Sequence, residues 1–219
     1  MERAGIQVFE TLAAEYDAWF DQHRVVYESE LQALKTLAGS HRRGLELGVG
    51  TGRFAVPLKI TLGLEPARAM AALAARRGVQ VVGAVAEALP FSADSFDLVA
   101  IITALCFFRD PLAALTEATR VLTSSGRLLL GMIDKDSPLG REYEAHRSES
   151  KFYRDARFYG VRDVLIWLKK LGYEDEKLCQ TIFRNLAEIT APEPVREGFG
   201  AGGFVVISAR KVDSGTVTA

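Results

Sequence analysis

Three glycines follow a short apolar run near residue 45 and could cradle a nucleotide. The segment Leu45–Phe54 reads LELGVGTGRF, so Gly48, Gly50 and Gly52 fall at alternate positions. Glycine adopts positive φ and lets the backbone approach a ligand closely, and a strand that runs through such a turn into a helix is a nucleotide-binding arrangement. A dinucleotide fingerprint would need its third glycine at position 53, where this chain has Arg53. The loop taken alone is also compatible with an ordinary tight turn.

Two glutamates flank this glycine segment. Glu65 follows the apolar run Ile60–Leu64, where its carboxylate could accept hydrogen bonds from both ribose hydroxyls of an adenosine and would repel a 2′-phosphate. Glu46 lies inside the apolar run before the glycines, and a buried carboxylate needs a partner such as the ammonium group of a ligand. Two structural alternatives stay open, namely a solvated strand-end charge for Glu65 and a salt bridge to Arg42 for Glu46.

The hydrophobic pattern predicts the scaffold that would position these residues. Five short runs rich in Val, Ile, Leu or Phe are interpreted as strands: Gly44–Val49, Ile60–Leu64, Val79–Val85, Phe96–Ala104 and Arg127–Ile133. Helical patterns lie between them at Ala67–Arg77 and Pro111–Leu122. Strands that alternate with helices and are apolar almost throughout are typical of a parallel sheet covered on both faces.

Helices are also predicted before this alternating core. Apolar residues at spacings of three and four indicate helices over Phe9–Phe20 and Tyr27–Leu37, and Gly39 is a helix stop. No repeat of fixed period and no low-complexity linker divides the chain. The length of 219 residues therefore fits one α/β domain with a modest elaboration.

The residues after the core have a different texture. The segment Lys135–Tyr159 is dense in charged and aromatic residues, and a helix is expected from about Val161 to Leu171. Two further strand candidates follow, Leu178–Phe183 and Gly203–Arg210. The last residues, Val212–Ala219, are expected to form a frayed tail.

Composition excludes several classes of function. The formal net charge is −1 and no basic run occurs, so no bulk attraction to nucleic acid or to an anionic membrane is expected. No apolar run approaches the roughly 18 residues needed to cross a bilayer, and Met1–Phe9 lacks a signal-peptide core. Cys106 and Cys179 lie far apart without metal-ligand spacing, so we expect reduced thiols, no metal site and a cytoplasmic location.

Several motifs together resemble the class I S-adenosylmethionine-dependent methyltransferases. They are ELGVGTG, LEP, AEALPF, SFDLV and the segment LTEATRVLTSSG, and YDAWF at Tyr16–Phe20 is similar to the N-terminal helix of one small-molecule branch. That branch includes the ubiquinone and menaquinone biosynthesis C-methyltransferases, and the matches run from about residue 9 to residue 134. The resemblance implies a doubly wound, mainly parallel seven-stranded sheet with an N-terminal helical lid, in which Gly203–Arg210 is the antiparallel strand.

The resemblance also implies a domain organisation. Residues 1–211 would form a single methyltransferase domain, and residues 212–219 the frayed tail. Within that domain, residues 1–40 would be the helical lid and residues 135–160 an insertion on the substrate side.

The family's cofactor contacts transfer position by position as implied roles. Glu46 would lie near the ligand ammonium, Glu65 would hold the ribose hydroxyls, and Thr103 would offer its carbonyl to the ammonium. The other implied cofactor residues are Tyr16, the loop residues Gly48, Val49, Gly50 and Gly52, and the adenine neighbours Pro66, Met70, Ala86 and Glu87. Many members carry an Asp where this chain has Val85, so the usual acceptor for the adenine amino group is missing.

The implied function is methyl transfer from S-adenosylmethionine to a small-molecule acceptor. A methyl sulfonium is already activated, so the protein mainly aligns the nucleophile, and a base is needed only if the acceptor must lose a proton. His23 and His146 are weak candidates for that base, and a solvated surface histidine is the alternative for each. TALCFF stands after the fourth strand, where amino-methylating nucleic-acid enzymes carry Asn/Asp-Pro-Pro-Tyr, so DNA is not the expected substrate.

Three alternatives remain open at this stage. An NAD-dependent oxidoreductase would share the sheet and Glu65. A non-catalytic relative that binds an adenosine ligand for regulation would keep the glycine loop. A methyltransferase of protein or RNA would be expected to show a basic or extended docking surface, which this composition does not suggest. The sequence does not distinguish methylation of carbon, nitrogen or oxygen.

Overall fold

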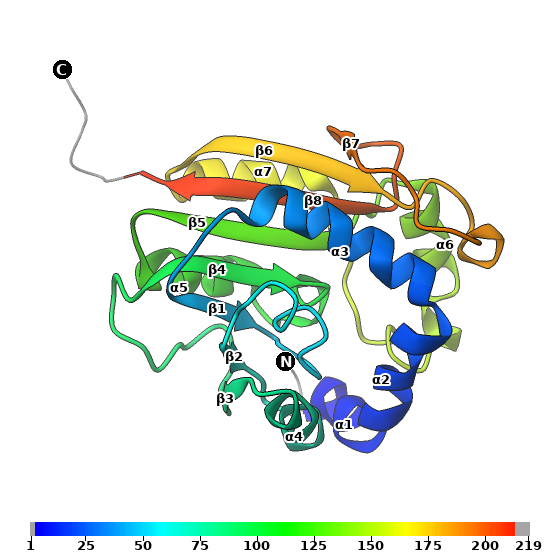
Figure 1. The fold of residues 1–219 in the computed structure, drawn as a ribbon, viewed down its shortest axis with the longest axis horizontal. Helices are drawn as coiled ribbons and strands as arrows, with labels where there is room; N and C mark the ends of the chain where they lie inside the picture. The colour runs from blue at the N-terminus through cyan, green and yellow to red at the C-terminus, as the bar shows by residue number, and fades with distance from the viewer. Residues whose placement is uncertain (1–2, 213–219) are drawn as a thin grey trace.

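One mixed β-sheet forms the centre of the computed structural model, which describes residues 3–212 (Figure 1). Its strands follow the order β3-β2-β1-β4-β5-β8-β6-β7, and β1 to β5 are parallel to one another. The bounds are β1 (Gly44–Leu47), β2 (Leu62–Leu64), β3 (Gln80–Val82), β4 (Phe96–Ile102), β5 (Leu122–Ile133), β6 (Tyr173–Thr181), β7 (Arg196–Glu197) and β8 (Phe204–Lys211). The predicted doubly wound α/β class is confirmed.

The sheet contains one strand more than the seven that were predicted. The additional strand, β7, has only two residues and pairs antiparallel with β6 at the sheet edge. The predicted antiparallel strand Gly203–Arg210 is present as β8, which lies between β5 and β6 and runs antiparallel to both. Strand β7 was not predicted from the sequence, because its two residues are exposed and charged and show no hydrophobic alternation.

Helices cover both faces of the sheet, as the apolar strands predicted. Along β4, Leu98, Ala100 and Ile102 pack toward α3, whereas Val99 and Ile101 belong to the cluster of α5 and α7 on the other face. The helices are α1 (Arg3–Thr11), α2 (Ala13–Gln22), α3 (Arg24–Ala38), α4 (Arg68–Arg76), α5 (Pro111–Val121), α6 (Pro138–Ala145) and α7 (Val161–Lys170). Short 3₁₀ turns occur at Leu105–Phe107, Arg147–Glu149 and Leu186–Glu188.

The single helix predicted over residues 9–20 is two helices. The chain bends at Leu12 (φ −112°, ψ 22°), between α1 and α2. Hydrogen bonds from Leu12 N to Val8 O and from Tyr16 N to Leu12 O continue across the bend, so the 3.6-residue period persists while the direction changes. Helix α3 then starts immediately after His23 and ends before Gly39, whose φ of +65° confirms the predicted stop.

Irregular turns over residues 51–59 follow the glycine loop, at the place where a nucleotide-binding strand–turn–helix arrangement has its helix. Pro57 lies in this segment and cannot donate a backbone hydrogen bond to the Arg53 carbonyl four residues earlier. Tyr27 Oη donates to that carbonyl instead, at 2.6 Å. The two bonds that span four residues, from Val56 N to Gly52 O and from Leu58 N to Phe54 O, are long at 3.3 and 3.2 Å, in keeping with the irregular winding.

The predicted insertion at 135–160 contains a helix that the sequence analysis did not assign. Helix α6 starts where the Ser137 hydroxyl accepts a hydrogen bond from Gly140 N at 2.9 Å, with Pro138 at the first helical position. None of the helices described over residues 3–212 has the length and apolar character needed to cross a membrane.

Residues 213–219, which include most of the tail predicted to be frayed, lie outside the described part of the chain.

Candidate binding site at the glycine loop

The glycine loop lies at the carboxyl end of β1 and requires glycine at two positions. Gly48 (φ +73°) donates its N–H to Leu64 O at 2.8 Å, and a Cβ there would lie 2.6 Å from the Cβ of Ala104. Gly52 (φ +82°) packs against the backbone of Ala74 in α4, where a Cβ would lie 3.2 Å from its Cα. Gly52 therefore allows the loop and α4 to approach closely, and Arg53 takes no part in that packing.

Glu65 is tied to the same loop by backbone donors. Its Oε2 accepts a hydrogen bond from Gly50 N at 3.0 Å, and its Oε1 accepts one from Ala67 N at 2.9 Å. The side chain is buried, and burial raises the pKa of this carboxyl to about 7 although both N–H donors oppose the shift. The alternative of a solvated strand-end charge is thereby excluded, and Glu65 becomes a fixed acceptor beside the loop.

Glu46 lies buried in the middle of the parallel sheet. Its cross-strand neighbours are Gly63 on β2 and Ala100 on β4, and Glu46 itself is 1% exposed. Its Oε2 has no hydrogen-bond partner, and burial raises the pKa of this carboxyl well above its usual value. Since Arg42 is exposed and no described donor satisfies Glu46 Oε2, the predicted alternative of a salt bridge to Arg42 is not supported. An orphaned buried acceptor fits the ammonium group of a ligand.

A cavity of about 50 Å³ opens beside the loop, and we call it the loop cavity. It is lined by Phe9, Tyr16, Gly48, Gly50, Glu65, Met70, Ile102, Thr103, Ala104, Phe107 and Phe108. Six predicted cofactor residues therefore come together: Tyr16, Gly48, Gly50, Glu65, Met70 and Thr103. Phe9 contacts Tyr16 and Phe107 edge to face, with ring centroids 5.5 and 5.0 Å apart. The YDAWF motif marked Tyr16, whereas no motif marked Phe9 or Phe107.

The other predicted cofactor residues surround the loop cavity without lining it. Val49, Gly52 and Ala86 are buried, and Pro66 borders a surface groove that Glu65 and Val85 also line. The Glu87 carboxylate accepts hydrogen bonds from the backbone N–H groups of Arg109 and Asp110, at 2.8 and 3.3 Å. In this structure Glu87 thus fixes the turn before α5, and its role toward adenine stays a prediction.

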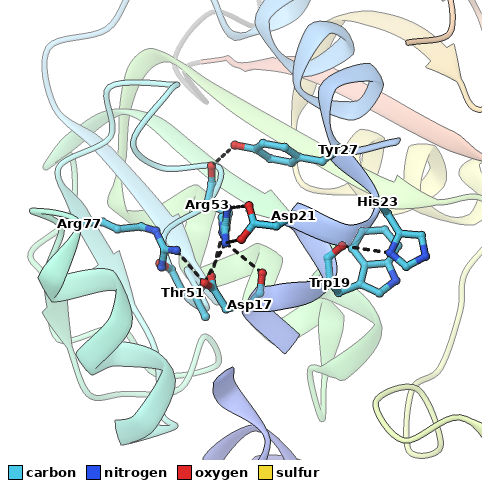
Figure 2. Close-up of polar contacts among 8 residues, drawn as sticks. All are labelled: Asp17, Trp19, Asp21, His23, Tyr27, Thr51, Arg53 and Arg77. Carbon is cyan, nitrogen blue, oxygen red and sulfur yellow. Dashed lines mark hydrogen bonds and ion pairs between the residues drawn. The ribbon is translucent and has the colours of Figure 1, made fainter. Parts of the chain in front are cut away.

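Arg53 joins the glycine loop to α2 through a cluster of ion pairs (Figure 2). Its guanidinium lies 2.9 Å from Asp17 Oδ2 and 2.7 Å from Asp21 Oδ2. Arg77, at the end of α4, also binds Asp17 at 2.8 Å and donates to the Thr51 carbonyl. These charges hold the pKa of the Asp17 carboxyl well below its usual value, against the effect of burial. We call Asp17, Asp21, Arg53 and Arg77 the Arg53 cluster; it fastens the predicted lid to the loop.

A second cavity, of about 170 Å³, adjoins the first and is called the aromatic cavity. Tyr16 and Thr103 line both cavities. The other lining residues are Trp19, Phe20, Val26, Glu30, Ile133, Leu139, Tyr143, Ser150, Phe152, Tyr153 and Leu186. The predicted lid and the predicted insertion thus meet around one hollow, and Lys151 Nζ joins Glu15 Oε1 between them at 2.6 Å.

Glu30 is the polar residue of this cavity that the sequence analysis missed. It is buried on α3 beside Val26, Ala33 and Leu34, which occupy the same helical face. Burial raises the pKa of its carboxyl to about 8. The signal was available, since a charged residue at helical spacing within an apolar stripe is unusual.

The two histidine candidates lie outside both cavities. His23 stacks on Trp19 with ring centroids 4.5 Å apart, and its Nδ1 lies 3.0 Å from the Trp19 carbonyl. His146 is exposed, and its Nδ1 lies 3.1 Å from the Glu142 carbonyl. Each ring therefore meets a helix-terminal carbonyl four residues earlier, which favours a structural role. Among the described residues, no cluster of His, Cys, Asp or Glu could hold a metal ion.

Comparison with known proteins gives consistent matches. A family model described as "Methyltransferase domain" matches residues 45–130. A solved S-adenosylmethionine-dependent methyltransferase of Thermotoga maritima, described as a possible histamine N-methyltransferase, superposes with a TM-score of 0.91 at 47% identity, covering 94% of this chain and 99% of that one. An uncharacterized protein of Methanocaldococcus jannaschii is 45% identical over 207 residues, which are 94% of this chain and 100% of that protein.

The menaquinone branch is supported only weakly. The demethylmenaquinone methyltransferase of Lactococcus lactis is 24% identical over 230 residues, covering 96% of this chain and 86% of that protein. This identity is far below that of the Thermotoga and Methanocaldococcus proteins. The similar motifs therefore indicate the wider methyltransferase family rather than this branch. The dinucleotide alternative for the glycine loop is excluded by the same matches.

Proposed function

The chain belongs to the class I S-adenosylmethionine-dependent methyltransferases, and from this premise we propose that it methylates a small-molecule acceptor held in the aromatic cavity. One observation carries the proposal: this cavity adjoins the loop cavity, and Tyr16 and Thr103 line both. An acceptor atom at that shared wall would lie next to the cofactor. A volume of about 170 Å³ suits a compact molecule rather than a polymer segment.

The residues around the loop cavity fit the cofactor. Glu65 would accept hydrogen bonds from the ribose hydroxyls, because Gly50 N and Ala67 N already orient its carboxylate. Glu46 would receive the ammonium group, since its Oε2 has no other partner. Gly48 and Gly50 would let the backbone approach the ligand. When bound, S-adenosylmethionine supplies a methyl sulfonium that is already activated for transfer.

The protein's own part in the reaction is alignment and exclusion of water. Phe9 and Tyr16 pack over the loop cavity, so α1 and α2 must shift for the cofactor to enter. The Arg53 cluster would restore the closed position afterwards, because it fastens α2 to the loop. Holding acceptor and cofactor in one closed site can contribute about 7–11 kcal/mol to the rate.

Labelling tests the class of acceptor. The protein is incubated with methyl-labelled S-adenosylmethionine and a cell extract that has been divided by ultrafiltration into small molecules and macromolecules. We expect label in the small-molecule fraction only. Label confined to protein or RNA contradicts the proposal. S-adenosylhomocysteine binding without any transfer favours the non-catalytic alternative.

A further inference from the structure

The aromatic cavity contains a carboxylate that forms no ion pair with any of the described side chains. Glu30 is 8% exposed and lines the cavity wall. No lysine, arginine or histidine is among the lining residues, and burial alone accounts for the shifted pKa of Glu30. A buried carboxylate without a cationic partner is costly. Its retention in a ligand-sized hollow points to a partner that arrives with the ligand.

The rest of the cavity favours a positively charged partner. Six aromatic side chains surround it: Tyr16, Trp19, Phe20, Tyr143, Phe152 and Tyr153. The faces of aromatic rings carry partial negative charge and attract ammonium groups, most strongly where water is excluded. An anionic ligand would meet both these faces and Glu30. The electrostatic preference of the cavity is therefore for a cation.

We propose that Glu30 binds the ammonium group of a small amine, and that the nitrogen of this amine is the atom methylated. This inference rests on the proposed function and names its substrate class. Glu30 is placed for the task because its cavity also contains Tyr16 and Thr103, which border the cofactor side. The aromatic rings would enclose the carbon skeleton of the amine.

The proton balance fits a carboxylate at this position. An ammonium nitrogen has no lone pair, so it first gives one proton to the Glu30 carboxylate. The neutral amine then attacks the methyl carbon, the S–CH₃ bond breaks, and its electron pair stays on sulfur. The methylated product leaves as an ammonium ion, and Glu30 returns its proton to water. A carboxyl whose pKa lies at about 8 can hold that proton near neutral pH.

Fluorescence titration measures the binding step without the cofactor. Trp19 lines the cavity, whereas Trp167, the other tryptophan of the chain, does not. The probe is 2-phenylethylamine, compared with 2-phenylethanol and 3-phenylpropanoate, which keep a similar skeleton and remove or reverse the charge. We expect the amine to bind at least about tenfold more tightly than the alcohol, and the carboxylate not to bind. Equal binding of amine and alcohol overturns the proposal.

Glu30→Gln removes the charge and keeps the shape. We expect amine affinity to fall at least about tenfold while calorimetric S-adenosylhomocysteine affinity stays unchanged. Glu28→Gln on the same helix is the matched control, because Glu28 pairs with Arg24 outside the cavity. An amine affinity that is unchanged in Glu30→Gln contradicts the inference. If Glu30→Gln does not fold, the comparison of the three probes on the native chain decides.

The pH profile adds a signature that a packing role would not give. Amine affinity should rise about tenfold from pH 7 to pH 9, as Glu30 ionises while the probe stays cationic. Burial raises the pKa of the facing phenols of Tyr16, Tyr143 and Tyr153, so they stay neutral. Glu193, whose backbone packs on α3, is paired with Arg184. Failure of the proposed function is distinguishable, since S-adenosylhomocysteine would then not bind or label would enter macromolecules.

Discussion

The two adjoining cavities differ in how the protein holds the carboxylate of each. Beside the loop cavity, Glu65 is held by two backbone N–H groups from a glycine loop and a helix start. In the aromatic cavity, Glu30 projects from α3 among side chains that come from separate segments of the chain. Backbone geometry defines the first cavity, and side-chain identity defines the second. The first is therefore prepared for a constant ligand, and the second can change its ligand through a few substitutions.

Removing the Glu65 carboxylate is the strongest test of this difference between the two cavities. We expect Glu65→Ala to weaken S-adenosylhomocysteine binding about 100-fold, because two charge-assisted hydrogen bonds to ribose are lost and Gly50 N loses its acceptor. Calorimetric titration measures the affinity. Glu176→Ala, an exposed position on β6, serves as the control. A change below about threefold would show that backbone contacts alone define the site.

The pH dependence of cofactor binding sharpens the same contrast. The pKa of Glu65 is about 7 without ligand, and hydroxyl donors favour the ionised carboxylate, so binding should release protons and weaken up to tenfold per pH unit below pH 7. The raised pKa of Glu46 acts in the same direction. Titration in buffers of different ionisation enthalpy measures the release, and Glu65→Gln should reduce it.

The same pKa predicts the pH dependence of folding. The Glu65 carboxyl titrates near 4.3 when unfolded and at about 7 when folded. The folded state therefore binds more protons between these values, and its contribution to stability falls as the pH rises through that window. The contribution is constant above pH 7. Denaturant unfolding of the native chain and Glu65→Gln across this range checks the sign.

Loosening the lid should affect both cavities together, since Tyr16 on α2 lines both. Arg53→Ala leaves Asp17 largely buried with only Arg77, and we expect a loss of about 2 kcal/mol in the free energy of unfolding. Hydrogen exchange should accelerate in α2. Arg24→Ala breaks an exposed pair with Glu28 and should leave the free energy of unfolding nearly unchanged. Equal exchange in the two variants would contradict this role for the Arg53 cluster.

The smallest expected effect concerns the irregular segment behind the loop. Tyr27→Phe leaves the Arg53 carbonyl without its donor and should cost about 1 kcal/mol. Pro57→Ala restores a backbone N–H that can reach the same carbonyl, so we expect the double variant to recover part of the loss. Urea unfolding of the four proteins completes the cycle. Purely additive losses would show that Pro57 does not cause the irregular winding.

The sheet and the loop cavity could be predicted because their signals are local. Apolar runs marked β1 to β5, and the glycines with Glu65 marked the cofactor side. The irregular turns at 51–59 were not predicted, because the donor that replaces the missing N–H of Pro57 at the Arg53 carbonyl, the Tyr27 hydroxyl, comes from another helix. Arg53 was weighed only as a missing glycine, although its partners Asp17 and Asp21 lie more than thirty residues away.

The aromatic cavity could be predicted only in part. The resemblance placed residues 135–160 on the substrate side, and Tyr143, Phe152 and Tyr153 of this segment line the cavity. Glu30 was not suspected, because no motif contains it and its significance depends on four segments that surround it. His23 and His146 were the weak candidates for a base, whereas burial raises the pKa of the Glu30 carboxyl to about 8.

The position of β8 determines the order in which the strands can assemble during translation. Strand β6 pairs only with β8 and β7, while β8 lies between β5 and β6. A nascent chain can thus assemble β1 to β5 on the ribosome, but β6 has no neighbour to join other than the two-residue strand β7 until residues 204–211 have emerged. Until then β5 presents an open edge. Of the eight strands described, the last to be translated thus closes the sheet from its interior rather than from its edge.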